Sequence, residues 1–358
     1  MQDFYEIDFH NVDSNTGGEA ITIRYCKNDK IFIHVVDGGY QNTGDMLIEN
    51  INKYYDNPSY IDHVVLTHND NDHAGGLRKI LEEYSIGTLW MLRPWLYAEE
   101  MINDFSKYKS VENLKSRLKE IYSNIAALEE IAIERKIKIG EPFQGAQIGA
   151  FTVLSPNKEQ YLHLILDSEK TPAVKENFSS IESFAKSFKE GIKYKLSEWG
   201  LEIFPEEGTS CENEMSIIQY ANLCDKKIIL TGDAGREALN IAAEYLNYIS
   251  VSLPGIDLFH VPHHGSRHNL TSKLLDKLLG RKFTYKPEKG EELFKALISA
   301  SEKDDDHPRK SVIRALIHRG AKVCVTKGKG FCSGINNPSR LNWSTLKGME
   351  YPEDQEEY

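Results

Sequence analysis

The feature that most constrains this chain is a short β-prone run that leads directly into a cluster of metal-binding side chains. Residues 64–67 read Val-Val-Leu-Thr, and His68, Asp70, Asp72 and His73 follow within six positions. A buried strand that ends in such a loop holds ligands rigidly beside solvent, and the tight spacing lets one loop serve two metals. A solvated acidic turn with two chance histidines is the alternative reading. The apolar run before the cluster favours the ligand loop.

The residues around this loop predict alternating strands and helices. Gly75 and Gly76 follow the ligands, and we expect them to turn the backbone sharply and bring it close to the bound group. Asp37 ends a strand-like run, and we expect it to face the metal loop and orient its ligands, with an Asp-Gly turn as an equal alternative. An α/β layered fold follows from this order of elements. The expected strands are 21–25, 31–36 and 86–92, and the expected helix is 45–58.

Two further strands in the second half also end in residues that bind metals. Residues 228–230 are apolar and lead to Asp233, a carboxylate that needs a counter-charge at such a place. A helix N-cap is its alternative role. Residues 257–261 lead to His263 and His264. We also predict a helix from 236 to 245, strands at 148–155, 296–300 and 320–326, and a helix at 312–319.

Composition bounds the class of protein. The chain has 358 residues, 40% hydrophobic and 27% charged, as in an ordinary soluble protein. No apolar run approaches the ~20 residues that span a bilayer, and no signal peptide is visible, so we expect no membrane contact and a cytoplasmic location. Five scattered cysteines argue against a disulfide framework. A net charge of −11 excludes a protein that coats nucleic acid with its whole surface, but it allows a local basic groove.

The pattern His-x-Asp-x-Asp-His-x-Gly-Gly at 68–76 resembles the signature of the metallo-β-lactamase superfamily. It is more similar to the branch that contains the nuclease domain of the DNA-uptake protein ComEC, which has Asp at the position of Asp70. The resemblance runs from Phe9 to about Val325. It implies an αββα sandwich of two mixed sheets flanked by helices, with the site at one edge where the loops that follow the strands meet.

We expect one domain over residues 1–345 and an acidic, frayed tail over 346–358. Two stretches, about 95–136 and 157–208, are longer than this branch requires, and we interpret them as insertions that set specificity or bind a protein partner.

The resemblance also assigns roles to individual residues. It implies that Asp233 bridges two metals, and that a superfamily His before Asp233 is missing, because no His lies between His163 and His260. His263 aligns with a glycine elsewhere in the superfamily, so we expect His264 to be the ligand. One metal is then held by His68, Asp70 and Asp233, and the other by Asp72, His73, His264 and Asp233. Contacts behind the ligands or with substrate are expected from Asp37, Asn213, His263 and Ser266.

The expected chemistry is hydrolysis of a phosphodiester with two divalent ions. Oxygen-rich ligands favour Mn²⁺ or Mg²⁺ over zinc, while the imidazoles keep Zn²⁺ a candidate. A pair of metals would hold a bridging hydroxide, which Asp72 would orient while His307 assists the leaving oxygen. His307-Pro308 matches the second His-Pro of the ComEC-like branch, and Asp305-Asp306 replaces the first.

Nucleic acid is the expected substrate class of this metallo-hydrolase. A small-molecule metallohydrolase acting on a cyclic nucleotide, phosphorylcholine ester, lactone or thioester is one alternative. A non-catalytic regulatory subunit that retains the metal loop is the other. The lysines and arginines of residues 267–289 form a candidate phosphate-contact patch, although a solvated face is an equally good reading.

Overall fold

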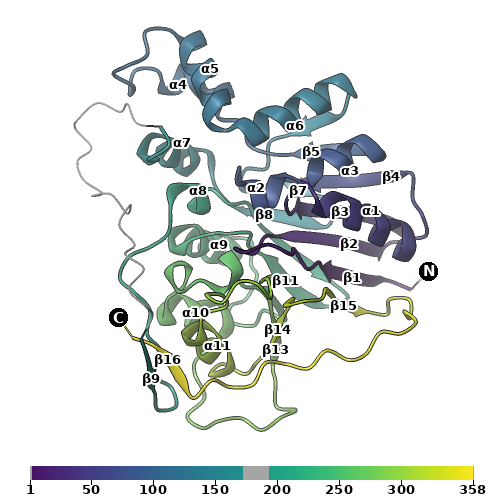
Figure 1. The fold of residues 1–358 in the computed structure, drawn as a ribbon, viewed down its shortest axis with the longest axis vertical. Helices are drawn as coiled ribbons and strands as arrows, with labels where there is room; N and C mark the ends of the chain where they lie inside the picture. Colours follow the sequence, from purple (N-terminus) through teal and green to yellow (C-terminus); the bar gives the residue numbers. More distant parts are fainter. Residues whose placement is uncertain (1, 172–192, 358) are drawn as a thin grey trace.

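The computed structural model describes residues 2–171 and 193–357. In this part of the chain, two mixed sheets of seven strands each pack face to face between two layers of helices, which confirms the predicted αββα sandwich (Figure 1). The first sheet has the strand order β15 (Phe331–Ile335), β1 (Phe4–Phe9), β2 (Ala20–Lys27), β3 (Lys30–Gly38), β4 (Tyr60–Val65), β5 (Ser85–Trp90) and β6 (Lys138–Gly140). The second has the order β14 (Ala321–Val325), β13 (Phe294–Ile298), β12 (Leu258–His260), β11 (Lys226–Leu230), β10 (Ile218–Leu223), β8 (Phe151–Ser155) and β7 (Gln147–Ile148).

Each sheet combines an antiparallel part with a parallel part. Strands β15, β1, β2 and β3 pair antiparallel, whereas β3, β4, β5 and β6 pair parallel. In the second sheet β7, β8, β10 and β11 pair antiparallel, and β11 to β14 pair parallel. Parallel neighbours need helical crossovers. For five of the six parallel pairs these are α1 (Thr43–Tyr54), α3 (Leu77–Glu83), α9 (Arg236–Tyr248), α10 (Ser272–Leu279) and α11 (Lys310–Ile317), and the helices of residues 98–134 connect β5 to β6.

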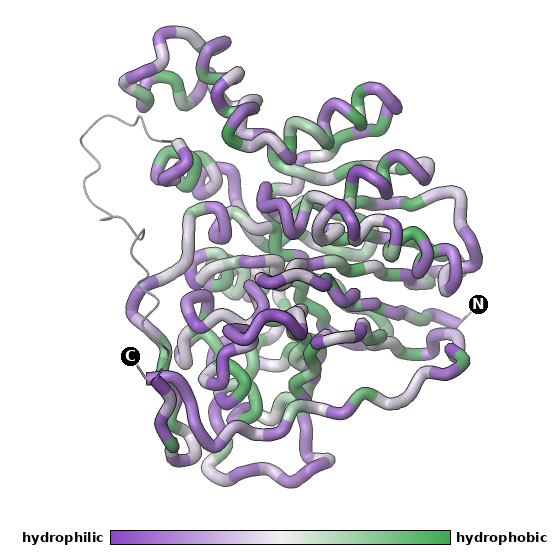
Figure 2. The backbone as a smooth tube through the Cα atoms, in the orientation of Figure 1, coloured by the Kyte–Doolittle hydropathy of each residue, from purple (hydrophilic) through white to green (hydrophobic). Residues whose placement is uncertain are grey.

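The apolar side chains form three layers that follow this architecture. One layer lies between the sheets and contains Ile7, Phe151 and Leu297. A second packs the first sheet against its helices, and a third packs the second sheet against α9, α10 and α11. Figure 2 shows the hydrophobic residues concentrated along the strands and on the inner helix faces. Within the described residues, no helix has both the length and the apolarity needed to cross a bilayer.

The stretch predicted as a first insertion is helical, as expected. It contains a 3₁₀ turn (Pro94–Tyr97), α4 (Ala98–Met101), α5 (Val111–Ile121) and α6 (Ser123–Glu134). Leu114, Leu118 and Leu128 are fully buried there. Asn124 Nδ2 donates to the carbonyl of Asn69 at 2.8 Å, so this insertion contacts the ligand loop.

The second stretch, 157–208, begins with α7 (Lys158–Asp167) and contains β9 (Tyr194–Leu196); residues 172–192 lie outside the described part of the chain.

The prediction of a frayed acidic tail is wrong for its last residues. Strand β16 (Asp354–Glu356) pairs antiparallel with β9, and Gln355 and Glu356 are buried. The Glu356 carboxylate accepts the N–H groups of Lys310 at 2.8 Å and Ser311 at 2.9 Å, at the start of α11. The first N–H groups of a helix have no partner inside the helix and carry partial positive charge, so an acidic side chain is well placed there.

Candidate metal centre

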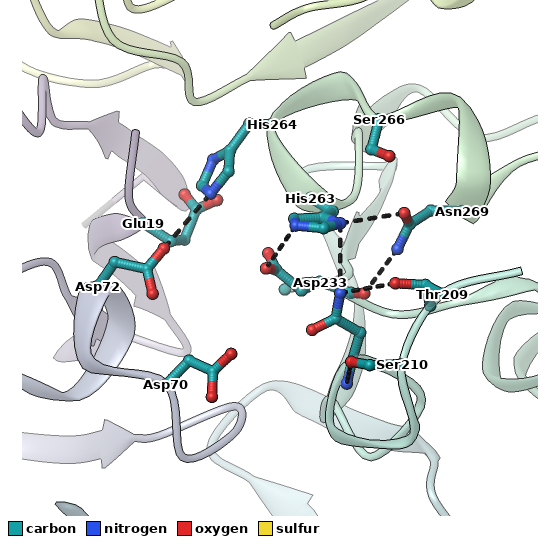
Figure 3. Close-up of polar contacts among 12 residues, drawn as sticks. Glu19, Asp70, Asp72, Thr209, Ser210, Asp233, His263, His264, Ser266 and Asn269 are labelled. Carbon is teal, nitrogen blue, oxygen red and sulfur yellow. Dashed lines mark hydrogen bonds and ion pairs between the residues drawn. The ribbon is translucent and has the colours of Figure 1, made fainter. Parts of the chain in front are cut away.

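The predicted ligands meet at the carboxyl ends of the parallel strands. The loops after β4, β11 and β12 converge there, with Ser299 just beyond β13 and Asp37 at the end of β3. In open α/β sheets this edge is where ligands bind, because the loops that follow neighbouring parallel strands lie side by side. Figure 3 shows the carboxylates of Asp70 and Asp72 on one side and those loops of the second sheet that carry Asp233 and His263 on the other.

The turn at 68–76 is compact because it contains one short helix, α2 (Asn71–Ala74), which begins after Asp70. The atoms nearest to a Cβ placed on Gly75 or Gly76 are backbone atoms, mostly of residues 38–44, and none belongs to a ligand side chain. A Cβ on Gly76 would lie 2.1 Å from the carbonyl oxygen of Gly38, and the Gly76 N–H donates to the Gly39 carbonyl at 3.1 Å. These glycines therefore permit close packing of the turn against the end of β3, which positions the ligand loop from behind.

Asp37 is fully buried and sits behind the turn. Its Oδ1 accepts the Thr67 N–H at 2.8 Å, and its Oδ2 accepts the Thr67 hydroxyl at 2.6 Å and His73 Nδ1 at 2.7 Å. With Nδ1 occupied, the Nε2 lone pair of His73 remains for a ligand. A metal-binding histidine usually donates its other ring N–H in this way.

Asp233 lies between the two halves of the cluster. Its Oδ1 is 3.4 Å from His73 Nε2, and its Oδ2 is 3.9 Å from His68 Nε2 and 3.7 Å from His263 Nε2. Burial favours the neutral acid, but His73 and His263 outweigh it and hold the pKa of Asp233 well below its ordinary value. The carboxylate is therefore ionised and faces both groups of candidate ligands.

Asp72 and His264 form the other side of the cluster. Asp72 Oδ2 is 3.7 Å from His73 Nε2 and 3.6 Å from His264 Nε2. His264 Nδ1 donates to the Ser299 carbonyl at 2.8 Å, which again turns Nε2 toward the carboxylates. Burial opposes protonation of His264, yet Asp72 and Asp233 raise its pKa to about 9. Without a cation, a proton holds this carboxylate–imidazole pair together.

The remaining predicted residues lie around this cluster. Asp70 Oδ2 is 3.8 Å from His68 Nε2, and its Oδ1 accepts Lys170 Nζ at 3.0 Å. His307 Nδ1 donates to Asp304 at 3.0 Å, and its ring centroid is 6.4 Å from that of His264.

Asn213, in the short helix α8 (Cys211–Glu214), lies 3.2 Å from His263 Nδ1 through its Nδ2 atom. Ser266 does not turn its hydroxyl toward the ligands, because that oxygen accepts the His268 N–H at 3.3 Å within its own turn.

Three buried atoms at the centre of the cluster have no hydrogen-bond partner: His68 Nε2, His73 Nε2 and Asp233 Oδ1. Buried polar atoms are nearly always paired, so such a group suits an ion that accepts electron pairs. Two triads have ligand atoms within 4.8 Å of one another, His68–His73–Asp233 and Asp72–His73–His264. The residues present therefore fit a divalent cation. Because His73 offers only the single lone pair of Nε2, it can bind the cation of one triad but not of both.

Other residues of the centre are not evident from the sequence. Glu19, buried at the start of β2, accepts the Ser299 hydroxyl at 2.6 Å and lies 2.8 Å from His260 Nε2. Its own N–H donates to the Asp72 carbonyl at 3.0 Å. Glu19 thus joins the first sheet to the second directly beneath the ligands. A glutamate after two glycines, at 17–19, was the only signal for it.

Comparison with known proteins agrees with this architecture. Residues 29–105, which include the ligand turn, match the family model of the metallo-beta-lactamase superfamily, and no curated protein matches the sequence. Among solved structures, a diphosphatase from the PhnP family is 10% identical, with 93% of this chain and 97% of that chain covered and a TM-score of 0.37. CmlA, a diiron beta-hydroxylase from Streptomyces venezuelae, is 10% identical, with 89% and 44% covered and a TM-score of 0.32.

The dizinc quorum-quenching lactonase AidC is 13% identical, with 64% of this chain and 68% of that chain covered and a TM-score of 0.28. Over the part of the chain that carries the ligand turn, and in its sandwich of two mixed sheets between helices, this chain is therefore similar to the metallo-beta-lactamase superfamily.

Proposed function

We propose that this chain is a metal-dependent phosphodiester hydrolase that acts on nucleic acid with two divalent cations. The observation that carries the proposal is the pair of ligand groups that share His73, where three buried atoms lack a hydrogen-bond partner. His68, Asp70 and Asp233 would hold one cation, and Asp72, His73, His264 and Asp233 the other. Three carboxylates suit Mn²⁺, with Mg²⁺ and Zn²⁺ as further candidates.

Two neighbouring cations, when bound, supply an acidified water for attack and neutralise charge on the leaving oxygen. The chain's own residues contribute orientation and proton transfer. Burial alone would raise the pKa of Asp72, but His73 and His264 lower it to about 2. This carboxylate is therefore ionised and can accept a hydrogen bond from the attacking water. His73 and His264 keep Asp72 in place from two sides.

His307 is the proposed proton donor to the leaving oxygen. Burial lowers the pKa of His307, and Asp304 opposes this because its carboxylate stabilises the imidazolium. In the neutral ring, the Nδ1–H bond to Asp304 leaves Nε2 as the atom that takes and passes on the proton. Substitution of His307 should therefore slow the reaction most for substrates with a poor leaving group.

A basic recess supports a polyanionic substrate over a small molecule. It has a volume of about 770 Å³ and lies between β14 and β15, the edge strands of the two sheets. Among the described residues that line it, none is Asp or Glu. Lys327 connects it to the centre, because its Nζ donates to the carbonyl of Asp304, the residue that holds His307. The lysines of the recess are Lys295, Lys322, Lys327, Lys329 and Lys347.

By contrast, lysines of the patch predicted at 267–289 are engaged elsewhere. Lys286 pairs with Glu353 at 2.8 Å and Lys277 with Glu244 at 3.5 Å. The resemblance of the ligand turn to the ComEC-like branch also supports nucleic acid as substrate.

The test is incubation of the purified chain with single- and double-stranded DNA, RNA and bis(p-nitrophenyl) phosphate, each with Mn²⁺, Mg²⁺ or Zn²⁺. We expect cleavage that Asp72→Ala and Asp233→Asn abolish, while Asp45→Asn, an exposed carboxylate paired with Lys79, keeps the wild-type rate. A preparation that binds metal but cleaves none of these substrates would overturn the proposal. Cleavage of the small ester alone would favour the small-molecule alternative. A chain without any hydrolytic activity, whose Asp72→Ala variant still binds its protein partner, would favour a regulatory subunit.

A further inference from the structure

The first cation position has fewer histidine ligands than the second. His68, Asp70 and Asp233 surround it, so it has one nitrogen ligand, and the sequence has no histidine between His163 and His260 to supply another. Asn213, the motif residue nearest to that gap, donates its amide to Thr209 Oγ1 at 2.7 Å and faces His263 rather than His68. A different residue must complete this position if it binds as tightly as its neighbour.

His263 reaches the same carboxylate oxygen as His68. Its Nε2 is 3.7 Å from Asp233 Oδ2, and His68 Nε2 is 3.9 Å from that oxygen. The other oxygen, Oδ1, is instead closest to His73, on the side of the second position. Figure 3 shows the His263 ring pointing at the Asp233 carboxylate, while His264 points at Asp72. The two adjacent histidines therefore serve different ends of the cluster.

The hydrogen bonds behind His263 leave its Nε2 free as a ligand atom. Asn269 Nδ2 donates to the carbonyls of Asp233 at 2.8 Å and Ala234 at 3.2 Å, so its Oδ1 must face His263 Nδ1, 3.1 Å away. An amide oxygen only accepts, so Asn269 can take the Nδ1 proton that His263 must carry when Nε2 is a ligand. The Asn213 amide, whose Nδ2 is 3.2 Å from the same Nδ1, then donates to Thr209 Oγ1 instead. His73 and His264 have the same arrangement, with Nδ1 donating to Asp37 and to the Ser299 carbonyl.

The backbone is also shaped for two ligands in sequence. His263 has φ 49° and His264 has φ 55°, so two consecutive non-glycine residues adopt the left-handed conformation. Each such residue costs on the order of 1 kcal/mol or more, and such strain is concentrated at functional sites. Here it turns adjacent side chains to the two ends of the cluster, with ring centroids 5.8 Å apart.

We infer that His263 is the third protein ligand of the first cation position, where it replaces the histidine that the sequence lacks before Asp233. The inference rests on the two-cation centre of the proposed function, but it does not depend on the substrate. The His263 side chain is 32% exposed, so this position is also the one that opens to solvent and substrate.

The test is metal content and affinity, measured by elemental analysis and by titration of the metal-free chain with Mn²⁺ and Co²⁺. We expect two cations per wild-type chain. His263→Phe should keep one and weaken the other by more than about 100-fold, because residues that merely support ligands are already worth about 10–100-fold. His263→Asp supplies an oxygen ligand and should retain both. His268→Gln, in the same loop, should match the wild type.

Pairing the variants identifies the position. If His263 serves the first cation, His263→Phe with His68→Phe still binds one cation, whereas His263→Phe with His264→Phe binds none tightly. The Co²⁺ absorption of His263→Phe should lose the bands of one site only, with unchanged far-ultraviolet circular dichroism. Two cations of near wild-type affinity in His263→Phe would overturn the inference. A wild-type chain that binds two cations but cleaves no phosphodiester would instead overturn the proposed function and leave this inference standing.

Discussion

Asp37 illustrates how a residue outside the ligand set controls the metal centre. It accepts three hydrogen bonds from Thr67 and His73, and it is fully buried. An asparagine at this position has one acceptor oxygen fewer and presents an N–H to one of the donors.

We expect Asp37→Asn to weaken divalent-cation binding by about 10–100-fold with little change in fold. Calorimetric titration with Mn²⁺ measures the effect. Asp62→Asn is the matched control, since Asp62 also accepts a backbone N–H, that of Ile33 at 2.9 Å, but lies outside the centre. Equal affinities for the two variants would show that Asp37 does not orient His73.

Residue types, their places after apolar runs and the resemblance of the ligand turn to the superfamily signature together selected residues that are close in space. His68, Asp72, His73, Asp233 and His264 all lie together in the structure. The position of His263 could not be predicted, because it depends on the backbone conformation of its own turn and on the orientation of the Asn269 amide. Glu19 was not predicted either, because its partners come from the opposite sheet.

At the scale of elements, the loop after β9 is held to α11 and α10 by one buried carboxylate. Glu202 accepts Arg319 Nη1 at 2.6 Å and His318 Nδ1 at 2.9 Å, and its side chain is 1% exposed. Burial alone would raise its pKa, but the bonds from His318 and Arg319 lower it from 4.5 to about 2. Because the folded pKa lies below the unfolded one, this stabilisation is complete above pH 4.5 and disappears as the pH falls toward 2.

We expect Glu202→Gln to lose about 3 kcal/mol of unfolding free energy at neutral pH, from a pKa difference of about 2.5 units. The variant should also depend less on pH between 4.5 and 2. Urea denaturation at a series of pH values measures both effects. Parallel stability curves for the wild type and the variant across that range would contradict the prediction.

Periodicity predicted most helices and strands of the core to within a few residues. The helix expected at 45–58 is α1 (Thr43–Tyr54), and the strand expected at 148–155 is a hairpin of β7 and β8. The error at the tail has a physical cause. Asp354–Glu356 has an acidic composition typical of a solvated end, and only tertiary partners, the edge of β9 and the start of α11, make it a strand.

At the scale of the whole molecule, the charge distribution is relevant to the proposed nucleic-acid substrate. The net charge is −11, yet five lysines line one recess whose described lining residues include no carboxylate. Lysines on edge strands also prevent sheets from pairing edge to edge, so the two roles need separate tests.

We expect the triple variant Lys322→Gln, Lys327→Gln, Lys347→Gln to bind a single-stranded oligonucleotide more weakly, with a smaller salt dependence. Each lost phosphate contact removes about 0.7 from the slope of log K against log salt for a single strand. Fluorescence anisotropy in EDTA, where no cleavage occurs, measures this. The control removes three exposed lysines from the helical insertion, Lys107, Lys109 and Lys115. Equal losses of oligonucleotide affinity in both variants would indicate that the recess lysines serve only to prevent edge-to-edge pairing of sheets.

Because the ligands come from loops of both sheets, cations should stabilise the whole fold. A ligand that binds only the folded state adds about 2.7 kcal/mol at 100 times its Kd. We therefore expect Mn²⁺ to raise the melting temperature and a chelator to reverse the rise, as measured by differential scanning fluorimetry. The melting temperature of Asp233→Asn should change little when Mn²⁺ is added. A wild-type melting temperature that changes with neither Mn²⁺ nor the chelator would contradict binding at this centre.

The distance along the chain between the two sides of the centre has a consequence for synthesis. Asp72 and His264 are separated by about half of the sequence, with strands β5 to β12 between them. A growing polypeptide therefore carries the first histidines and aspartates through much of translation before their counterparts leave the ribosome. The ligand cluster can therefore form only after the segment that carries His264 has been made, and a product terminated before that segment would lack it.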